Sequence, residues 1–270
     1  YEQNGIEFTY VGTSDLDAVK AAFKANTKAV YIETPTNPMM EITDIRALVG
    51  IAHERNALVI IDNTFLSPYF QKPLTLGADI VVHSGTKFIG GHHDVISGFT
   101  IVKDVDIAAK LRLTYKTVGA CLSAMDSWLV IRGVKTLALR MEQHQKNAIA
   151  LAEWLKTQPQ VTKVLFPGLP EHPGYEVNKS QTTGFGGMLS FEVDSEETAK
   201  KVLEGIELIQ FAESLGGTES LLTYPLTQTH PDLKPEDAER KGITRRLLRL
   251  SVGIEDTDDL IADLDQAFSK

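Results

Sequence analysis

Residues 58–91 read LVIIDNTFLSPYFQKPLTLGADIVVHSGTKFIGG, and this stretch decides the fold class. Leu58–Ile61 is a continuous apolar run that ends at Asp62, which is typical of a strand buried on both faces. A second strand is expected over 79–84, followed by a loop rich in glycine and hydroxyl side chains. Strands that alternate with helices predict a mainly parallel sheet, whose ligands bind beyond the carboxyl ends of the strands.

The same alternation continues on both sides of this stretch. Asp44 can cap a helix whose apolar stripe begins at Ile45, and a long helix over 124–156 could link two domains. We therefore expect an α/β domain over 1–141 and a smaller α+β domain over 142–270. The other expected strands lie at 29–33, 96–102, 160–166, 187–193 and 247–252, and the other helices at 104–116, 195–204 and 256–268.

Composition excludes several classes of protein. Of 270 residues, 43% are hydrophobic and 23% charged, which is the balance of a globular protein and argues against disorder. No apolar run approaches the roughly 18 residues of a membrane span. With 27 basic and 36 acidic residues the net charge is −9, which argues against a nucleic-acid partner. We expect a protein that binds a small molecule.

Cys121 is the single cysteine, so an internal disulfide or a cysteine-based zinc site cannot form. We expect Cys121 to be a small buried residue. No signal-peptide pattern is present in the given residues, and a reducing cytoplasm is the expected location. The chain opens on Tyr1 and runs at once into strand and helix patterns, so we expect a piece, or the ordered part, of a longer protein.

Three polar side chains follow consecutive predicted strands: Asn37, Asp62 and Lys87. Asp62 ends an apolar run, so its carboxylate should be partly desolvated and should favour a cation. Lys87 lies in a loop, 84–91, whose hydroxyls and glycines can hold a phosphate while the lysine reaches a group attached to it. A capping aspartate and a surface lysine are the alternatives. Together the three groups suit pyridoxal phosphate, which needs a lysine for a Schiff base and a carboxylate for its pyridine nitrogen.

These residues belong to a series of motifs that resembles the Cys/Met-metabolism family of pyridoxal-phosphate enzymes. That family includes cystathionine γ-synthase, cystathionine β- and γ-lyases and methionine γ-lyase. The resemblance implies pyridoxal-phosphate fold type I, an amino-acid substrate and a homotetramer built as a dimer of dimers. The motifs are ETPTNP at 33–38, DNTF at 62–65, SGTK at 84–87, GHHD at 91–94, AESLGGTESL at 212–221 and RLSVGIE at 249–255.

The resemblance implies roles for the cofactor-binding residues. Lys87 matches the Schiff-base lysine and Asp62 the partner of the pyridine nitrogen. Ser84 and Thr86 match hydroxyls that hold the phosphate, and Asn37 matches the residue near the cofactor's 3-hydroxyl. The family's N-terminal segment, with a glycine-containing phosphate loop, a stacking tyrosine and a Tyr/Arg pair for the neighbouring subunit, has no counterpart here.

For the substrate, Arg249 matches the arginine that holds the α-carboxylate, with Ser214 and Thr229 beside it. Arg249 also lies within the apolar strand 247–250, where an unpaired guanidinium would be costly, so a carboxylate partner is expected. The alternative is an internal salt bridge.

Two other patterns have simpler explanations than a ligand site. A metal site at His83, His92, His93 and Asp94 is disfavoured, because adjacent histidines point apart in an extended chain and no HExxH helix is present. We expect these side chains to hydrogen-bond the loop backbone. The acidic stretch 255–265 predicts an amphipathic C-terminal helix and does not match an EF-hand loop.

The function expected from the resemblance is a carbon–sulfur lyase of sulfur amino-acid metabolism. We favour β-elimination of cystathionine to homocysteine, pyruvate and ammonia, with γ-elimination or γ-replacement as the alternative. Glu213 beside Ser214 resembles the γ-synthase and γ-lyase members as well as β-lyases of the Gram-positive type. A non-catalytic remnant of the same fold is the rival hypothesis, and the presence of Lys87, Asp62 and Arg249 favours the enzyme.

Overall fold

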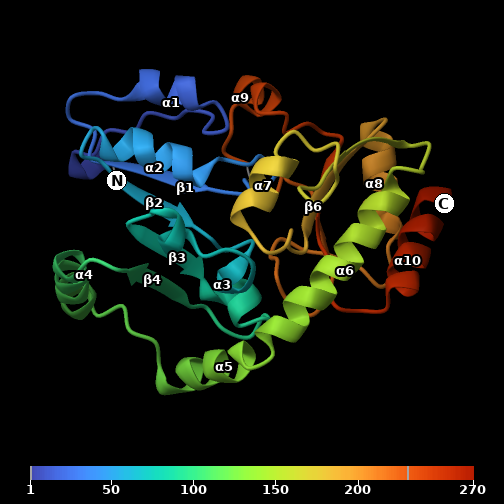
Figure 1. The fold of residues 1–270 in the computed structure, drawn as a ribbon. Coiled ribbons are helices and arrows are strands. Elements are labelled where there is room, and N and C mark those ends of the chain that lie inside the picture. Colours follow the sequence, from blue (N-terminus) through green and yellow to red (C-terminus); the bar gives the residue numbers. More distant parts are fainter. Residues whose placement is uncertain (1, 230) are drawn as a thin grey trace.

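The computed structural model describes residues 2–229 and 231–270, whose strands form two sheets (Figure 1). The first sheet has the order β1-β2-β3-β4, with β1 to β3 parallel and β4 antiparallel to β3. The second has the order β5-β6-β9-β8-β7, in which β7 and β8 are parallel and the other pairs antiparallel. The strands are β1 Ala29–Glu33, β2 Leu58–Asp62, β3 Ile80–Ser84, β4 Gly98–Val102, β5 Val161–Leu165, β6 Met188–Val193, β7 Gln210–Phe211, β8 Leu221–Thr223 and β9 Leu247–Ser251.

Helices flank both sheets, and none among the described residues is long and apolar enough to cross a bilayer. The amphipathic C-terminal helix predicted from the acidic stretch is α10, with the Asp256 carboxylate accepting from the N–H of Asp258. The helices are α1 Leu16–Ala22, α2 Ile45–His53, α3 Ser67–Phe70, α4 Val105–Val118, α5 Ala124–Val134, α6 Leu137–Leu155, α7 Tyr175–Gln181, α8 Glu196–Gly205, α9 Pro235–Arg240 and α10 Thr257–Ser269.

The first sheet follows the predicted strands, with one correction to their burial. Val59 and Ile61 of β2 are fully buried in a cluster with Leu48 of α2. Leu58, however, is 37% exposed, so the prediction that this strand is buried on both faces is wrong. The physical reason is the alternation of side chains along a strand: α2 packs on the face of Val59 and Ile61, and Leu58 points to the other.

The single helix predicted over 124–156 is two helices, α5 and α6, which are separated at residues 135–136. Thr136 has φ −108° and ψ 6°, outside the α-helical region. Gly133, near the end of α5, packs directly against the carbonyl of Gly90, a contact that leaves no room for a side chain. Beyond residues 135–136, α6 runs from the first sheet to the second (Figure 1).

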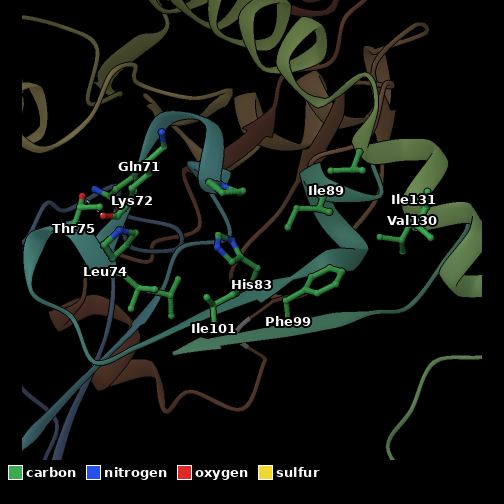
Figure 2. A pocket seen from close by; sticks show the side chains of 14 residues that line it. Gln71, Lys72, Leu74, Thr75, His83, Ile89, Phe99, Ile101, Val130 and Ile131 are labelled. Carbon is green, nitrogen blue, oxygen red and sulfur yellow. Dashed lines mark hydrogen bonds between the residues drawn. The ribbon is translucent and has the colours of Figure 1, made fainter. Parts of the chain in front are cut away.

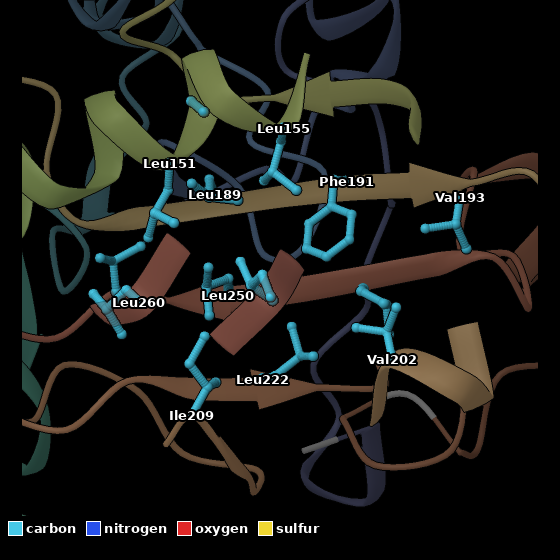
Figure 3. Close-up of a cluster of buried hydrophobic side chains, with 14 of the residues drawn as sticks. Leu151, Leu155, Leu189, Phe191, Val193, Val202, Ile209, Leu222, Leu250 and Leu260 are labelled. Carbon is cyan, nitrogen blue, oxygen red and sulfur yellow. The ribbon is translucent and has the colours of Figure 1, made fainter. Parts of the chain in front are cut away.

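The second half has a core made by one face of helix α6, by helix α10 and by the second sheet (Figure 3). Leu151 and Leu155 of α6 cover Leu189 and Phe191 of β6, and all four are fully buried. Met141, the predicted domain boundary, is also fully buried, in a cluster whose members come from both halves of the chain. The division into 1–141 and 142–270 stays a prediction.

Cys121 is exposed, so the prediction that it is a small buried residue is wrong. It lies between α4 and α5, and none of the residues of α4, all of them described, is buried. Because α4 packs no buried face against the rest of the chain, the segment that follows it has no hydrophobic core into which Cys121 could point.

Candidate active site

The carboxyl ends of β2 and β3 are joined through Thr64. The N–H and the hydroxyl of Thr64 donate to Asp62 Oδ1 at 3.0 and 2.6 Å, and Ser84 N–H donates to Thr64 Oγ1 at 2.8 Å. Tyr31 of β1 donates its hydroxyl to Asp62 Oδ2 at 3.3 Å. All the observed partners of Asp62 are neutral, and it takes part in none of the ion pairs found among residues 2–229 and 231–270. The expected cation is therefore not supplied by the described part of the chain.

Lys87 lies in a tight turn that follows β3. The N–H groups of Gly90 and Gly91 donate to the carbonyls of Gly85 and Lys87 at 2.8 and 2.7 Å, and Lys87 itself has φ −89° and ψ −130° within the turn. A side chain at Gly85 would collide with the ring of Phe99, so only glycine fits where the turn crosses β4. The turn therefore presents Lys87 rigidly.

Thr86 is tied to the same neighbouring segment. Its hydroxyl donates to the Ser97 carbonyl at 3.2 Å and accepts from the Ser97 N–H at 2.9 Å. A ligand phosphate would have to compete with the Ser97 carbonyl for this hydroxyl proton. Ser84, in contrast, uses its backbone N–H toward Thr64, and its side chain is half-buried.

The Lys87 amine is held by a residue from the second half of the chain. Lys87 Nζ donates to Ser214 Oγ at 3.1 Å. Burial lowers the pKa of Lys87, the positive charge of Arg249 lowers it further, and Glu213 acts in the opposite direction. A lysine in such surroundings is more often neutral at a given pH than a surface lysine, and a neutral amine is what nucleophilic or base chemistry requires.

The segment that carries Ser214 docks closely on the Lys87 turn. Thr218 N–H donates to the Gly91 carbonyl at 3.1 Å, and Gly216 N–H donates to Ser251 Oγ at 2.8 Å. Gly216 has φ +77°, and a Cβ there would lie 2.7 Å from the Phe88 backbone nitrogen. Glycine is therefore needed both for the conformation and for the close approach.

Arg249 lies on β9, between β6 and β8, and is 1% exposed. Its guanidinium donates to Asn37 Oδ1 at 3.0 Å and, from the other terminal nitrogen, to the Ser214 carbonyl and Thr223 Oγ1, both at 2.9 Å. Burial lowers its pKa to about 10, although the charges of Glu213 and Glu33 act to raise it.

The alternative of an internal salt bridge is not observed for Arg249. It takes part in none of the ion pairs of the described residues, and its Nε has no partner among them. The observed bonds use three of the five N–H groups that a guanidinium offers. A buried cation with neutral partners and spare donors suits an anionic ligand.

Glu33 is a site residue that the sequence reasoning missed. It ends β1 in register with Asp62 of β2, and its Oε2 accepts from the Asn37 N–H at 3.3 Å. Burial raises its pKa to about 7, with Asp62 as the second cause, while the Asn37 N–H and Arg249 act to lower it. The sequence contained a signal for this position: Glu33 is the one charged residue of the predicted strand 29–33 and precedes the turn that carries Asn37.

The structure thus brings most of the predicted residues into one network, which runs from Lys87 through Ser214, Arg249 and Asn37 to Glu33 and Asp62. Thr229 lies outside these contacts, in the segment after β8, where its hydroxyl donates to the Pro225 carbonyl at 3.3 Å. It is not linked to Arg249 by any of the hydrogen bonds described above.

The histidines do not gather as a metal site. Among the described residues, no three His, Cys, Asp or Glu side chains lie together in a way that could hold a metal ion. His92 Nδ1 is 2.8 Å from the Gly90 carbonyl, which is the loop-backbone contact expected from the sequence. His93 Nε2 is 3.8 Å from Glu219, and His83 is buried on β3.

A cavity of about 550 Å³ lies on another face of the first sheet. Figure 2 shows it between Val130 and Ile131 of α5 and the segment of Leu74, with Phe99 on the strand beneath. Side chains alternate along β3, so His83 points into this cavity and the side chain of Ser84 points to the opposite face of the sheet. Its walls are mainly apolar, and none of the predicted site residues lines it.

The side chains of this site have the chemical groups that pyridoxal phosphate requires. A half-buried amine of lowered pKa, Lys87, can bond an aldehyde, and the Asp62 carboxylate has no cationic partner among the described residues and can meet a protonated ring nitrogen. The unpartnered Nε of Arg249 marks a buried place for an anion.

Comparison with known proteins agrees with this fit. The model of the family "Cys/Met metabolism PLP-dependent enzyme" matches residues 1–269. The chain is 48% identical to cystathionine β-lyase of Bacillus subtilis (98% of this chain, 68% of the relative) and 49% identical to cystathionine γ-synthase of Haemophilus influenzae (98% and 68%). The crystal structure of cystathionine γ-lyase from Lactobacillus plantarum complexed with L-serine superposes with a TM-score of 0.97 at 46% identity (99% and 70%). The chain belongs to the pyridoxal-phosphate-dependent enzymes of Cys/Met metabolism.

Proposed function

We propose that this protein cleaves cystathionine by β-elimination, giving homocysteine, pyruvate and ammonia. The observation that carries the proposal is the position of Ser214. Its hydroxyl accepts from the Lys87 amine, and its carbonyl accepts from the Arg249 guanidinium. A base and a carboxylate-binding group are thereby held on the two sides of one residue, which suits an α-amino acid substrate.

In this proposal Lys87 holds the cofactor covalently, Asp62 pairs with its pyridine nitrogen, and Asn37 lies near its 3-hydroxyl. Ser84 and Thr86 donate to the phosphate. The bound cofactor supplies an electron sink for the negative charge that develops at the substrate Cα. The surroundings that lower the pKa of Lys87 favour a neutral amine, which would take the Cα proton.

Arg249 binds the substrate α-carboxylate with the N–H groups that are not used inside the protein. The proposed role of Thr229 beside the substrate rests on the family resemblance alone. Because the guanidinium is fixed by Asn37, Ser214 and Thr223, the bound carboxylate has a defined orientation. That orientation directs the Cα–H bond toward the Lys87 amine. The leaving thiol then departs from Cβ, and no second proton has to be removed.

The second candidate is γ-elimination or γ-replacement, which requires a further proton to be taken from Cβ. The negative charge of the exposed Glu213 acts on both Lys87 and Arg249, so Glu213 does not distinguish the two reactions. Relatives named as cystathionine β-lyase, cystathionine γ-lyase and methionine γ-lyase are all 48% identical to the chain, so identity does not choose among them.

We further propose a cytoplasmic homotetramer, built as a dimer of dimers, and the division into a cofactor domain (1–141) and a C-terminal domain (142–270). In support of assembly, α4 and α5 carry exposed apolar side chains: Leu113, Val118, Trp128 and Ile131 are 66%, 72%, 54% and 58% exposed. Sedimentation equilibrium measures the assembly, and a monomer at micromolar concentration would contradict it.

Product analysis tests the proposed reaction. The protein, loaded with pyridoxal phosphate, is incubated with L-cystathionine, and its keto acids are separated by chromatography. β-Elimination gives pyruvate together with homocysteine, and γ-elimination gives 2-oxobutyrate together with cysteine. An excess of 2-oxobutyrate would replace the proposal with γ-elimination, and the absence of both keto acids would leave γ-replacement and the non-catalytic remnant.

A further inference from the structure

Glu33 is a partly buried carboxyl that the proposed chemistry does not use. It stands at the carboxyl end of β1, beside Asp62 in the neighbouring strand. Two partly buried carboxyls in register repel each other when both are charged, and no cation of the described residues forms an ion pair with Glu33. This repulsion destabilises the fold, so the presence of a carboxyl at position 33 suggests a role in the site.

The contacts of Glu33 lead directly to Arg249. Its Oε2 accepts from the Asn37 N–H at 3.3 Å, and the side chain of the same Asn37 accepts from Arg249 at 3.0 Å. The next residue, Pro38, has its carbonyl bound by Ser190 Oγ at 2.7 Å, and Ser190 is paired with Arg249 between β6 and β9. The turn that carries Asn37 is therefore held from the first sheet by Glu33 and from the second by Ser190.

We propose that Glu33 is a positioning residue for substrate binding: its carboxyl fixes the backbone of Asn37 and thereby holds the Asn37 amide oxygen on the Arg249 guanidinium. This inference rests on the proposed role of Arg249 in binding the α-carboxylate. Without the bond from Glu33, Asn37 can turn away, and the guanidinium loses one of the groups that orient it. Glu33 acts only through Asn37 and does not touch the substrate.

The charge of Glu33 gives the arrangement a pH dependence. The groups that face it are Tyr31 on its own strand, Asp62 on β2 and Arg249 on β9. Burial and Asp62 raise the pKa of Glu33 to about 7, so the carboxyl is neutral in mildly acidic solution and charged in mildly alkaline solution. The Asn37 N–H can donate to either form of the carboxyl, so ionisation mainly adds a second negative charge near Arg249, which opposes the substrate carboxylate. The KM for an amino-acid substrate should therefore rise as Glu33 ionises.

The test compares Glu33→Ala, Glu33→Gln and Arg249→Ala with the wild-type holoenzyme, and Glu54→Gln serves as control because Glu54 is exposed at the end of α2. KM and kcat for L-cystathionine are measured from about pH 6 to about pH 8. Melting temperature and the affinity for pyridoxal phosphate are measured for each variant. These two readouts separate a folding or cofactor defect from a substrate defect.

Glu33→Ala should raise KM about tenfold, which corresponds to the loss of about 1.4 kcal/mol. Its kcat and cofactor affinity should change little. Glu33→Gln keeps an acceptor for the Asn37 N–H, so its KM should match the wild type at low pH and lack the wild-type rise at high pH. The control should behave as wild type throughout.

Two outcomes overturn the inference in different ways. If Arg249→Ala raises KM and Glu33→Ala leaves it within about twofold, Glu33 does not position the site and the proposed function stands. If Arg249→Ala leaves KM unchanged, the carboxylate site itself is wrong and the inference fails with it. Should Glu33→Ala fail to fold, Asn37→Ala removes the next link to Arg249, and a KM that stays within about twofold of the wild type refutes the proposal.

Discussion

Replacing Glu33 by glutamine should change how the stability of this protein depends on pH. Burial, and then Asp62, raise the pKa of Glu33 from 4.5 to about 7. One pKa unit corresponds to about 1.36 kcal/mol, so holding this carboxyl charged costs up to about 3 kcal/mol in the folded state. Glutamine keeps the shape and an acceptor for the Asn37 N–H and has no charge to bury.

The sign follows from proton linkage. The folded protein binds the Glu33 proton more tightly than the unfolded chain, so the stability that this group contributes is fully present below its ordinary pKa. It is lost as the pH rises through about 7, the folded-state value. His83, His93, His144 and His172 have lowered pKa values, mainly through burial, and act in the opposite direction. They are the same in both proteins and cancel in the difference.

Urea unfolding at a series of pH values measures this difference. At about pH 4 the two proteins should have similar free energies of unfolding, and by about pH 8 Glu33→Gln should be more stable by up to about 3 kcal/mol. Glu54→Gln, at an exposed position, should show no such divergence. A wild-type minus Glu33→Gln difference that stays flat would show that Glu33 ionises freely. A reversed sign would mean that its carboxylate pairs tightly with Arg249.

Four further substitutions test the site. Lys87→Ala should lose the visible absorption of bound cofactor and nearly all turnover, whereas Lys72→Ala, at an exposed position, should keep both. Asp62→Asn should keep its melting temperature, because an amide oxygen can accept both bonds from Thr64, but lose most of its rate; turnover within a few-fold of wild type would remove Asp62 from the mechanism. Arg249→Ala should raise KM by an amount equivalent to about 2–5 kcal/mol with cofactor affinity retained, and the reverse pattern would place Arg249 on the phosphate. Gly216→Ala should lower both the melting temperature and kcat, because its Cβ meets the backbone of Phe88; wild-type kcat would show that the position of Ser214 is not critical.

The sequence alone determined the elements of the fold and the chemistry of the cofactor residues. The strands predicted at 29–33, 58–61 and 79–84 form at 29–33, 58–62 and 80–84, and the helix capped by Asp44 forms as predicted. Apolar periodicity and caps depend on neighbours a few residues away. The placement of Asp62 and Lys87 at strand ends followed from the same local patterns. The errors at Leu58, at Cys121 and in the helix over 124–156 concern burial and close packing, which neighbours along the chain do not decide.

Only the tertiary structure decided how these groups act on one another. Lys87 meets Ser214 across 127 positions of sequence, and Arg249 meets Asn37 across 212, because the two sheets pack with their site edges together. Glu33 became a site residue only when the register of β1 and β2 placed it beside Asp62. The raised pKa of Glu33 and the lowered pKa values of Lys87 and Arg249 all have burial as their largest cause. Burial depends on which segments pack over a side chain, and these segments are often distant in sequence, so the local sequence pattern does not predict the pKa shifts.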